Sequence, residues 1–189
     1  MGKTLMIGIG GAGCELATHL QKEFTVRTIA IDTNKKGLAR CGIQEQLLLD
    51  ADLSHRSLAV DANLGRRAAE ASSETLAELL VGVKRLILVV GLGGSTGTGA
   101  APVIARLAKE KGIEILAAVT LPFSFETSRR PAALLGLVEL MDTGVEVLGY
   151  DQNEAICEGG VHAPLIATLT RAYGESRARL ISFLYQALN

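Results

Sequence analysis

The stretch GLGGSTGTGAAP at residues 91–102 decides which fold this chain adopts. It follows the apolar run LILVV at residues 86–90, which has the length of a buried strand, and it precedes residues 103–111, where apolar side chains recur at helical spacing. The sequence therefore predicts a strand, a glycine-rich turn, and a helix with Pro102 in its first turn. Backbone N–H groups at such a helix start favour anions, and glycine lets a phosphate approach the backbone closely. We interpret the stretch as a phosphate-binding loop.

Strands and helices alternate along the rest of the chain. Apolar runs predict further strands at residues 4–7, 28–31, 46–49, 113–121 and 145–148. Helical spacing predicts helices at residues 14–23, 65–81, 129–142 and 164–188, and a polar loop is expected at residues 50–63. This alternation is typical of an α/β fold with three layers, a mostly parallel Rossmann-like sheet covered by helices on both faces. We expect a single domain over residues 1–189, without a linker.

Composition narrows the class of protein. The formal net charge of −1 disfavours binding to nucleic acid by charge alone. Cys14, Cys41 and Cys157 lack the spacing of a metal or redox site, and the three histidines are scattered, so no protein metal site is expected. No apolar segment approaches the ~20 residues of a membrane span, and no basic start leads into the apolar region of a signal peptide, so we expect neither a span nor a signal peptide. We expect a soluble, cytoplasmic protein.

A second glycine loop creates a rival interpretation. GIGGAG at residues 8–13 follows the first predicted strand with the G-x-G-x-x-G spacing of dinucleotide-binding folds, and Asp32 lies 19 residues beyond Gly13. Alone, this loop favours the NAD-binding domain of an oxidoreductase, with Asp32 on a ribose hydroxyl. The richer loop at residues 91–99 has no role in that scheme, and neither loop continues as the GK[ST] of a P-loop. Two loops at neighbouring strand ends favour a mononucleotide, and the NAD-binding domain stays the alternative.

Segments in the first two thirds of the chain resemble the FtsZ/tubulin superfamily, and FtsZ most closely. Residues 91–102 resemble the superfamily's signature loop, GGGTGTG, and residues 7–13 resemble its first phosphate loop. Residues 30–34 resemble the second loop with the acid and the amide exchanged, and residues 120–130 resemble the sugar-binding loop. The likeness extends over residues 3–130 and is thin beyond them. It implies an FtsZ-like nucleotide-binding domain that binds GTP or GDP.

The resemblance implies a role for each matching residue. The nucleotide phosphates would contact the two glycine loops, at Gly10, Gly11, Ala12, Gly13, Gly93, Gly94, Ser95, Thr96, Gly97 and Thr98. Glu126 would accept ribose hydroxyls and Arg130 would donate to sugar or phosphate, unless the two form a solvated surface pair. The guanine base would contact Glu15, Tyr173 and Arg177. Glu15 as a solvated helix residue and Tyr173 as an ordinary core residue remain equally open.

Two departures from the family pattern concern GTP hydrolysis. The third loop, which senses the γ-phosphate, corresponds to residues 57–65 and is almost without glycine. Its Asp61 adds negative charge near a triphosphate unless Mg²⁺ intervenes. The sequence ends at Asn189, so we expect the loop that completes a neighbour's GTPase site and the family's second domain to be missing. We expect no catalytic residue in this chain and, at most, slow GTP hydrolysis.

The end of the chain suggests an interaction surface. LISFLYQAL at residues 180–188 is apolar almost all round, and a helix of that kind expects cover on both sides. We hypothesise that residues 180–189 contact a second copy or a partner protein. The alternative is a helix packed into its own domain. The expected function is assembly in membrane remodelling or cell division, with a membrane contacted only indirectly.

Overall fold

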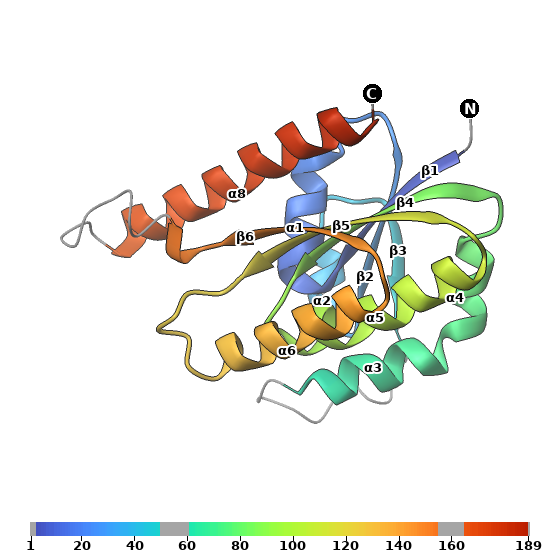
Figure 1. Ribbon diagram of the computed structural model, residues 1–189, viewed down its shortest axis with the longest axis horizontal. Helices are drawn as coiled ribbons and strands as arrows, with labels where there is room; N and C mark the ends of the chain where they lie inside the picture. The colour runs from blue at the N-terminus through green and yellow to red at the C-terminus, as the bar shows by residue number, and fades with distance from the viewer. Residues whose placement is uncertain (1–2, 50–60, 155–164, 189) are drawn as a thin grey trace.

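One parallel sheet organises the molecule. The computed structural model describes residues 3–49, 61–154 and 165–188. Within these residues six strands, all parallel, form a sheet in the order β3-β2-β1-β4-β5-β6 (Figure 1). The strands are β1 (Lys3–Ile9), β2 (Arg27–Asp32), β3 (Glu45–Leu48), β4 (Val83–Gly91), β5 (Glu114–Leu121) and β6 (Glu146–Asp151). The first strand of the chain therefore lies inside the sheet, between β2 and β4.

Helices cover both faces of the sheet and complete three layers (Figure 1). One face packs against α1 (Gly10–Leu20), α2 (Lys35–Arg40) and α8 (Leu165–Leu188). The other face packs against α3 (Ala62–Ala71), α4 (Ser73–Leu79), α5 (Ser95–Glu110) and α6 (Arg129–Asp142). This architecture confirms the predicted α/β fold.

The two cores follow from the alternation of side chains along each strand. In β1, Leu5 and Ile7 face the α3–α6 layer, whereas Met6 faces the α1–α8 layer. In β4, Leu88 and Val89 point to opposite cores in the same way. Because both faces are covered, these strands are continuous apolar runs in the sequence rather than alternating ones.

The main difference from the predicted fold is where α5 begins. The helix expected at residues 103–111 starts at Ser95, inside the glycine-rich stretch. The expectation that Pro102 lies in the first turn is therefore wrong, because about two turns precede it. Glycine is tolerated in this helix because α3 packs so closely against it. A Cβ atom at Gly99 would lie 1.9 Å from the carbonyl oxygen of Ala62.

Smaller differences occur elsewhere. The helix expected at residues 14–23 begins at Gly10, so the first glycine loop also opens a helix. The helix expected at residues 65–81 is two helices, interrupted at Ser72. α2 was not predicted, although Asn34 caps it by accepting from two of its backbone N–H groups. The other predicted strands and helices are confirmed with small shifts at their ends, and most of the expected loop at residues 50–63 lies outside the described residues.

The long C-terminal helix is present as α8. Leu180 and Leu184 are fully buried in the core that also contains the inner face of α1, so the domain itself covers this side of the helix. Tyr185 is half exposed, and its ring centroid lies 4.9 Å from that of Phe24. A partner surface at residues 180–189 stays a prediction. Among the helices described, α8 included, none has both the length and the hydropathy needed to span a bilayer.

Candidate functional site

A cavity opens where the two glycine loops meet. β1 and β4 are neighbours at the centre of the sheet, and the helices that follow them, α1 and α5, pack on opposite faces. Ligands bind at such a switch point, beyond the carboxyl ends of the strands. The cavity has a volume of about 930 Å³ and is lined by Gly10, Gly11, Ala12, Asp32, Thr33, Asn34, Lys35, Lys36, Gly37, Ala39, Gly91, Leu92, Gly94, Ser95, Thr96, Gly97 and Arg129.

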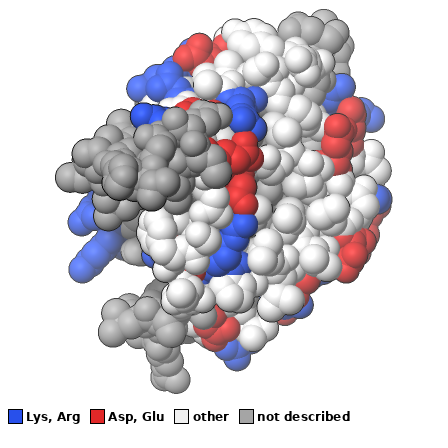
Figure 2. Space-filling model, turned by 60° about the vertical axis from the view of Figure 1, so that its left-hand side comes forward, with Lys and Arg blue, Asp and Glu red and all other residues white. Residues whose placement is uncertain are grey.

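The charges and dipoles around this cavity favour an anion. The first turns of α1 and α5 line it, and the N-terminus of each helix carries partial positive charge. Lys35, Lys36 and Arg129 add three positive side chains against the one carboxylate of Asp32. On the face shown in Figure 2, the described Lys and Arg residues are interspersed with Asp and Glu.

The glycines of the two loops have different tasks. A Cβ atom at Gly97 would lie 2.5 Å from the carbonyl oxygen of Gly91, so the fold itself requires glycine there. A Cβ atom at Gly11 or Gly94 would meet no other atom within 4 Å, and both residues line the cavity. These two positions leave backbone exposed beside open space. The cavity wall therefore fits a phosphate chain laid against bare backbone N–H groups.

The hydroxyl groups of the signature stretch bind mainly within the protein. Thr96 Oγ1 donates to Asp32 Oδ1 at 2.9 Å and lies 2.7 Å from Thr33 Oγ1. Thr98 Oγ1 accepts from the backbone of the same stretch and, at 1% exposure, does not line the cavity. Ser95 Oγ accepts from the backbone N–H of Asp61 at 2.9 Å. Ser95 therefore keeps its own proton to donate to a ligand.

Asp32 is a buried carboxylate in the cavity wall. It is 5% exposed, and burial raises the pKa of its carboxyl group, against the hydrogen bond that Thr96 donates. The backbone N–H of Asn34 also donates to Asp32 Oδ1, at 3.3 Å. Asp32 thus fixes the start of α2 against the first turn of α5. Sequence reasoning assigned Asp32 a ligand role only in the NAD-binding alternative.

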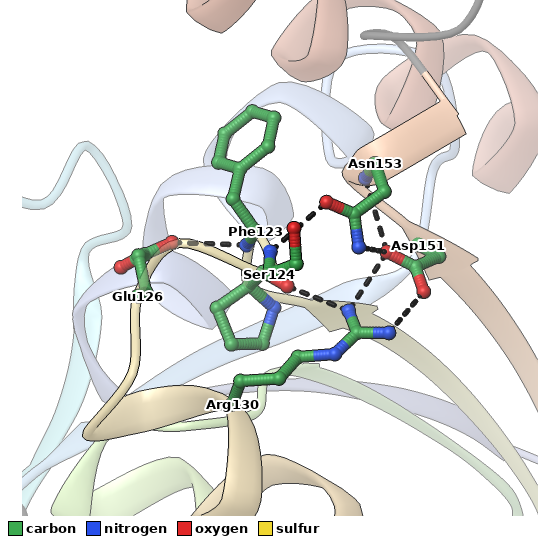
Figure 3. A network of polar contacts seen from close by, with 7 residues as sticks. Phe123, Ser124, Glu126, Arg130, Asp151 and Asn153 are labelled. Atoms are coloured by element: carbon green, nitrogen blue, oxygen red, sulfur yellow. Dashed lines mark hydrogen bonds and ion pairs between the residues drawn. The ribbon is translucent and has the colours of Figure 1, made fainter.

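Residues 122–126, called the sugar loop, belong to the segment that resembles the family's sugar-binding loop, and Figure 3 shows Phe123, Ser124 and Glu126 of this loop. Glu126 Oε1 accepts from the backbone N–H of Phe123 at 3.1 Å, and its other oxygen is 3.4 Å from Arg129 Nη1. Arg130 forms a bidentate ion pair with Asp151, which raises the pKa of Arg130 and lowers that of Asp151. Of these residues only Arg129 lines the cavity. The ribose roles expected of Glu126 and Arg130 stay predictions.

The expected base-binding residues lie along α1 and α8. The ring of Tyr173 packs edge-on against His19, with centroids 5.9 Å apart, and burial together with the charge of Glu15 raises the pKa of Tyr173. Arg177 Nη2 lies 3.4 Å from Glu23 Oε1. The structure thus brings Glu15 and Tyr173 together, about one turn of α1 beyond the cavity wall, without placing either in that wall.

Sequence reasoning missed part of the cavity and included residues outside it. Lys35 and Lys36 line the cavity because α2 begins beside it, and Asn34 as an N-cap was the signal that could have revealed this helix. Gly13, Gly93 and Thr98 were assigned to the phosphates but do not line the cavity. These residues lie behind the cavity wall. At Gly13, for example, a Cβ atom would lie 2.4 Å from the carbonyl oxygen of Val89.

Glycine loops that open helices at the switch point of a parallel sheet define an α/β class that binds phosphorylated ligands. Residues 3–159 match the family model described as Tubulin/FtsZ family, GTPase domain. The chain belongs to the Tubulin/FtsZ family. This membership confirms the resemblance inferred from the glycine loops, and it gives no support to the NAD-binding alternative.

The relatives include cell division proteins and solved structures. The chain is 37% identical over 141 residues to the cell division protein FtsZ of Neisseria gonorrhoeae, covering 72% of this chain and 36% of that protein. It is 34% identical over 159 residues to cell division protein FtsZ 2 of Methanocaldococcus jannaschii, covering 82% and 41%. An empty FtsZ dimer of M. jannaschii superposes with a TM-score of 0.83 at 29% identity, over 94% of this chain and 52% of that one.

A more distant structure shows the fold alone. CetZ2 of Haloferax volcanii, a protofilament with bound GTPγS, superposes with a TM-score of 0.80 at 24% identity, over 96% of this chain and 58% of that chain. The chain spans little more than a third of the length of the first curated relatives and about half of the solved chains. Its organisation as a single domain stays a prediction.

Proposed function

We propose that the chain binds a guanine nucleotide, GTP or GDP, in the cavity at the ends of β1 and β4. The observation that carries the proposal is the pair of helix starts, at α1 and α5, that present open backbone at Gly11 and Gly94 to one shared space. Phosphates against these two starts interact with both helix dipoles at once. Membership of the Tubulin/FtsZ family supports the guanine nucleotide as the occupant.

The remaining parts of the nucleotide extend along the walls already described. From the α1 start, a base laid along α1 approaches Glu15 and Tyr173, which lie together. The ribose then lies beside the sugar loop, near Glu126. The triphosphate end faces Ser95, whose hydroxyl is held by the backbone of Asp61.

Mg²⁺ is the cofactor that this charge pattern accommodates. Within residues 3–49, 61–154 and 165–188, no three His, Cys, Asp or Glu side chains form a group able to hold a metal ion. The Asp32 carboxylate nevertheless accepts from Thr96 in the first turn of α5, and Asp61 lies close to the same turn, because its backbone N–H donates to Ser95 Oγ. Mg²⁺ is usually held by substrate phosphates with one or two carboxylates, and such an ion would offset these charges beside a triphosphate.

Titration of the purified chain with GDP, GTP, ATP and NAD, with and without Mg²⁺, tests nucleotide binding. We expect binding of GDP and GTP, no binding of NAD, and a Mg²⁺ requirement that is stronger for GTP. Binding of NAD in preference to GDP, or no binding of any of the four, would overturn the proposal. Hydrolysis is measured in the same samples by release of inorganic phosphate.

We also propose that the chain acts through self-assembly or assembly with a partner, in cell division or membrane remodelling. Support comes from relatives: one solved structure is an FtsZ dimer, another is a CetZ2 protofilament, and the curated relatives named above are cell division proteins. Sedimentation velocity with GTP and Mg²⁺, against GDP alone, tests this. A monomer at all protein concentrations with either nucleotide contradicts self-assembly.

A further inference from the structure

The guanidinium of Arg130 is held by acceptors outside the cavity. Its Nη1 donates to the carbonyl oxygen of Pro122 at 2.7 Å and to Asp151 Oδ1 at 2.8 Å, and its Nη2 donates to Asp151 Oδ2 (Figure 3). The side chains of Arg130 and Asp151 are 21% and 29% exposed. To turn toward a ligand, Arg130 would have to break two charge-assisted hydrogen bonds of a bidentate pair.

Asp151 is itself fixed in place. It is the last residue of β6 and pairs in register with Leu121, the residue just before the sugar loop. Its Oδ1 also accepts from the backbone N–H and the Nδ2 of Asn153, at 3.0 and 2.9 Å. Asn153 in turn accepts from the backbone N–H of Ser124 at 2.9 Å. The end of β6 therefore ties down the sugar loop at two points.

Arg129 is the neighbouring arginine that faces the cavity. Its side chain is 58% exposed, and its Nη1 lies 3.4 Å from Glu126 Oε2 in a long ion pair. The position of its backbone depends on the sugar loop. A Cβ atom at Gly93 would lie 3.0 Å from both the carbonyl oxygen of Arg129 and Pro122 Cγ, so loop and signature stretch are in close contact.

We propose, resting on the proposed function, that Asp151 is a positioning residue for nucleotide binding. By holding Arg130 in the bidentate pair, Asp151 keeps that guanidinium out of the cavity and fixes the sugar loop against Gly93. Arg129, not Arg130, is then the guanidinium that contacts the nucleotide phosphates. The hydrogen bond from Arg130 favours the ionised form of Asp151 and lowers its pKa, which is consistent with a charged bidentate pair.

The test is a double-mutant cycle on GDP affinity, measured by calorimetry, with guanosine as the phosphate-free comparison. We expect Arg129→Gln to weaken GDP about tenfold, the loss of about 1.4 kcal/mol, and to leave guanosine unchanged. In the Asp151→Asn background the same change should cost less than about threefold, because the released Arg130 replaces Arg129. Arg106→Gln, an exposed arginine near the far end of α5, serves as the matched control and should change nothing.

A merely structural role for Asp151 would not produce this coupling. Equal losses from Arg129→Gln in both backgrounds, or a loss below about twofold in the unchanged protein, would overturn the inference. Absence of GDP and GTP binding by the unchanged protein would instead overturn the proposed function, and this inference with it. The two failures are therefore distinguishable.

Folding of the variants is checked by thermal unfolding and by hydrogen exchange at Ser124. Exchange should rise in Asp151→Asn and stay unchanged in Arg129→Gln, because only the former loosens the end of β6. If Asp151→Asn does not fold, Arg130→Lys provides the second background. Lysine keeps the charge at position 130 but cannot form the bidentate pair, so the coupling to Arg129→Gln should appear there also.

Discussion

At the scale of single residues, the glycines show how one residue type serves two purposes. Gly97 and Gly13 are required because backbone atoms of neighbouring segments occupy the space that a side chain would need. Gly11 and Gly94 face open space, so the packing of the chain does not require glycine at these positions. We attribute glycine there to the approach of a ligand. The sequence groups all four together, and only the three-dimensional contacts separate them.

Gly11→Ala is therefore expected to stabilise the protein while weakening nucleotide binding. Alanine in a helix is favoured over glycine by about 0.5–1 kcal/mol, and the added methyl group enters the space assigned to phosphate. Urea unfolding and GDP titration check the two effects. Gly174→Ala in α8, which also meets no atom within 4 Å, is the control. It should stabilise similarly and leave GDP affinity unchanged, and lowered stability in Gly11→Ala would contradict the assignment.

Asp32 makes a prediction about pH. Burial raises its pKa in the folded state above the ordinary value of 3.8. Its contribution to stability is therefore complete below pH 3.8 and is lost as pH rises through the folded-state pKa. Asp32→Asn removes this loss. The stability of the variant minus that of the unchanged protein should increase as the pH rises from about 3.8 through the folded-state pKa of Asp32. Urea unfolding at several pH values measures it, and a decrease with pH would show that hydrogen bonding outweighs burial.

At the scale of elements, the contact between α3 and α5 places the signature stretch. Besides Gly99 against Ala62, a Cβ atom at Gly65 would lie 2.2 Å from the carbonyl oxygen of Ser95. The helices touch backbone to backbone at both points. The N-terminus of α5 is therefore positioned by α3. The phosphate-binding loop at residues 91–102 thus depends on the contact between α3 and α5.

Gly99→Ala should consequently destabilise the chain, even though alanine is the better helix former. With a Cβ atom 1.9 Å from a carbonyl oxygen, α3 and α5 must separate, and overpacking of this kind costs about 1–3 kcal/mol or more. The change is measured by chemical unfolding. GDP affinity should fall as well, because Ser95 moves with the start of α5. A variant as stable as the unchanged chain would show that the helices are less tightly packed than described.

The same contact explains how far the sequence could predict these elements. Buried parallel strands such as residues 86–90 are predictable, because cover on both faces demands a continuous apolar run. The start of α5 was not predictable from propensity, because glycine disfavours helix and only the approach of α3 reverses that preference. α2 was overlooked for a different reason: its six residues are too few for a clear apolar period.

Sequence reasoning likewise predicted one part of the candidate site and missed another. Motif spacing identified the residues at the two helix starts, because backbone N–H groups bind phosphate whatever their neighbours are. It could not foresee which arginine faces the cavity. Arg129 and Arg130 are adjacent at the start of α6, and only Arg130 of the two pairs with Asp151 at the end of β6, whereas Arg129 lines the cavity.

At the scale of the whole molecule, α8 covers the α1 face of the sheet, and among the α8 residues 171–186, whose side chains are described, Tyr185 is the exposed large apolar residue. Leu184→Ala should cost about 2–5 kcal/mol of unfolding free energy, because Leu184 is fully buried. Tyr185→Ser, next to it and 49% exposed, should cost much less. Sedimentation of the folded Tyr185→Ser variant then tests the expected partner surface at residues 180–189 without disturbing the core. An unchanged oligomeric state would argue against that surface.

The position of β1 inside the sheet has a consequence for the folding of the chain during its synthesis on the ribosome. β1 is made before its partner β4, which comprises residues 83–91, so one edge of β1 stays unpaired until more than seventy further residues have been made. At synthesis rates of about 5–20 residues per second, that delay lasts several seconds. Throughout it the nascent chain presents an apolar strand with an unpaired edge, the kind of surface that aggregates or recruits chaperones. The yield of folded protein in a cell should therefore depend on how fast the ribosome reaches β4.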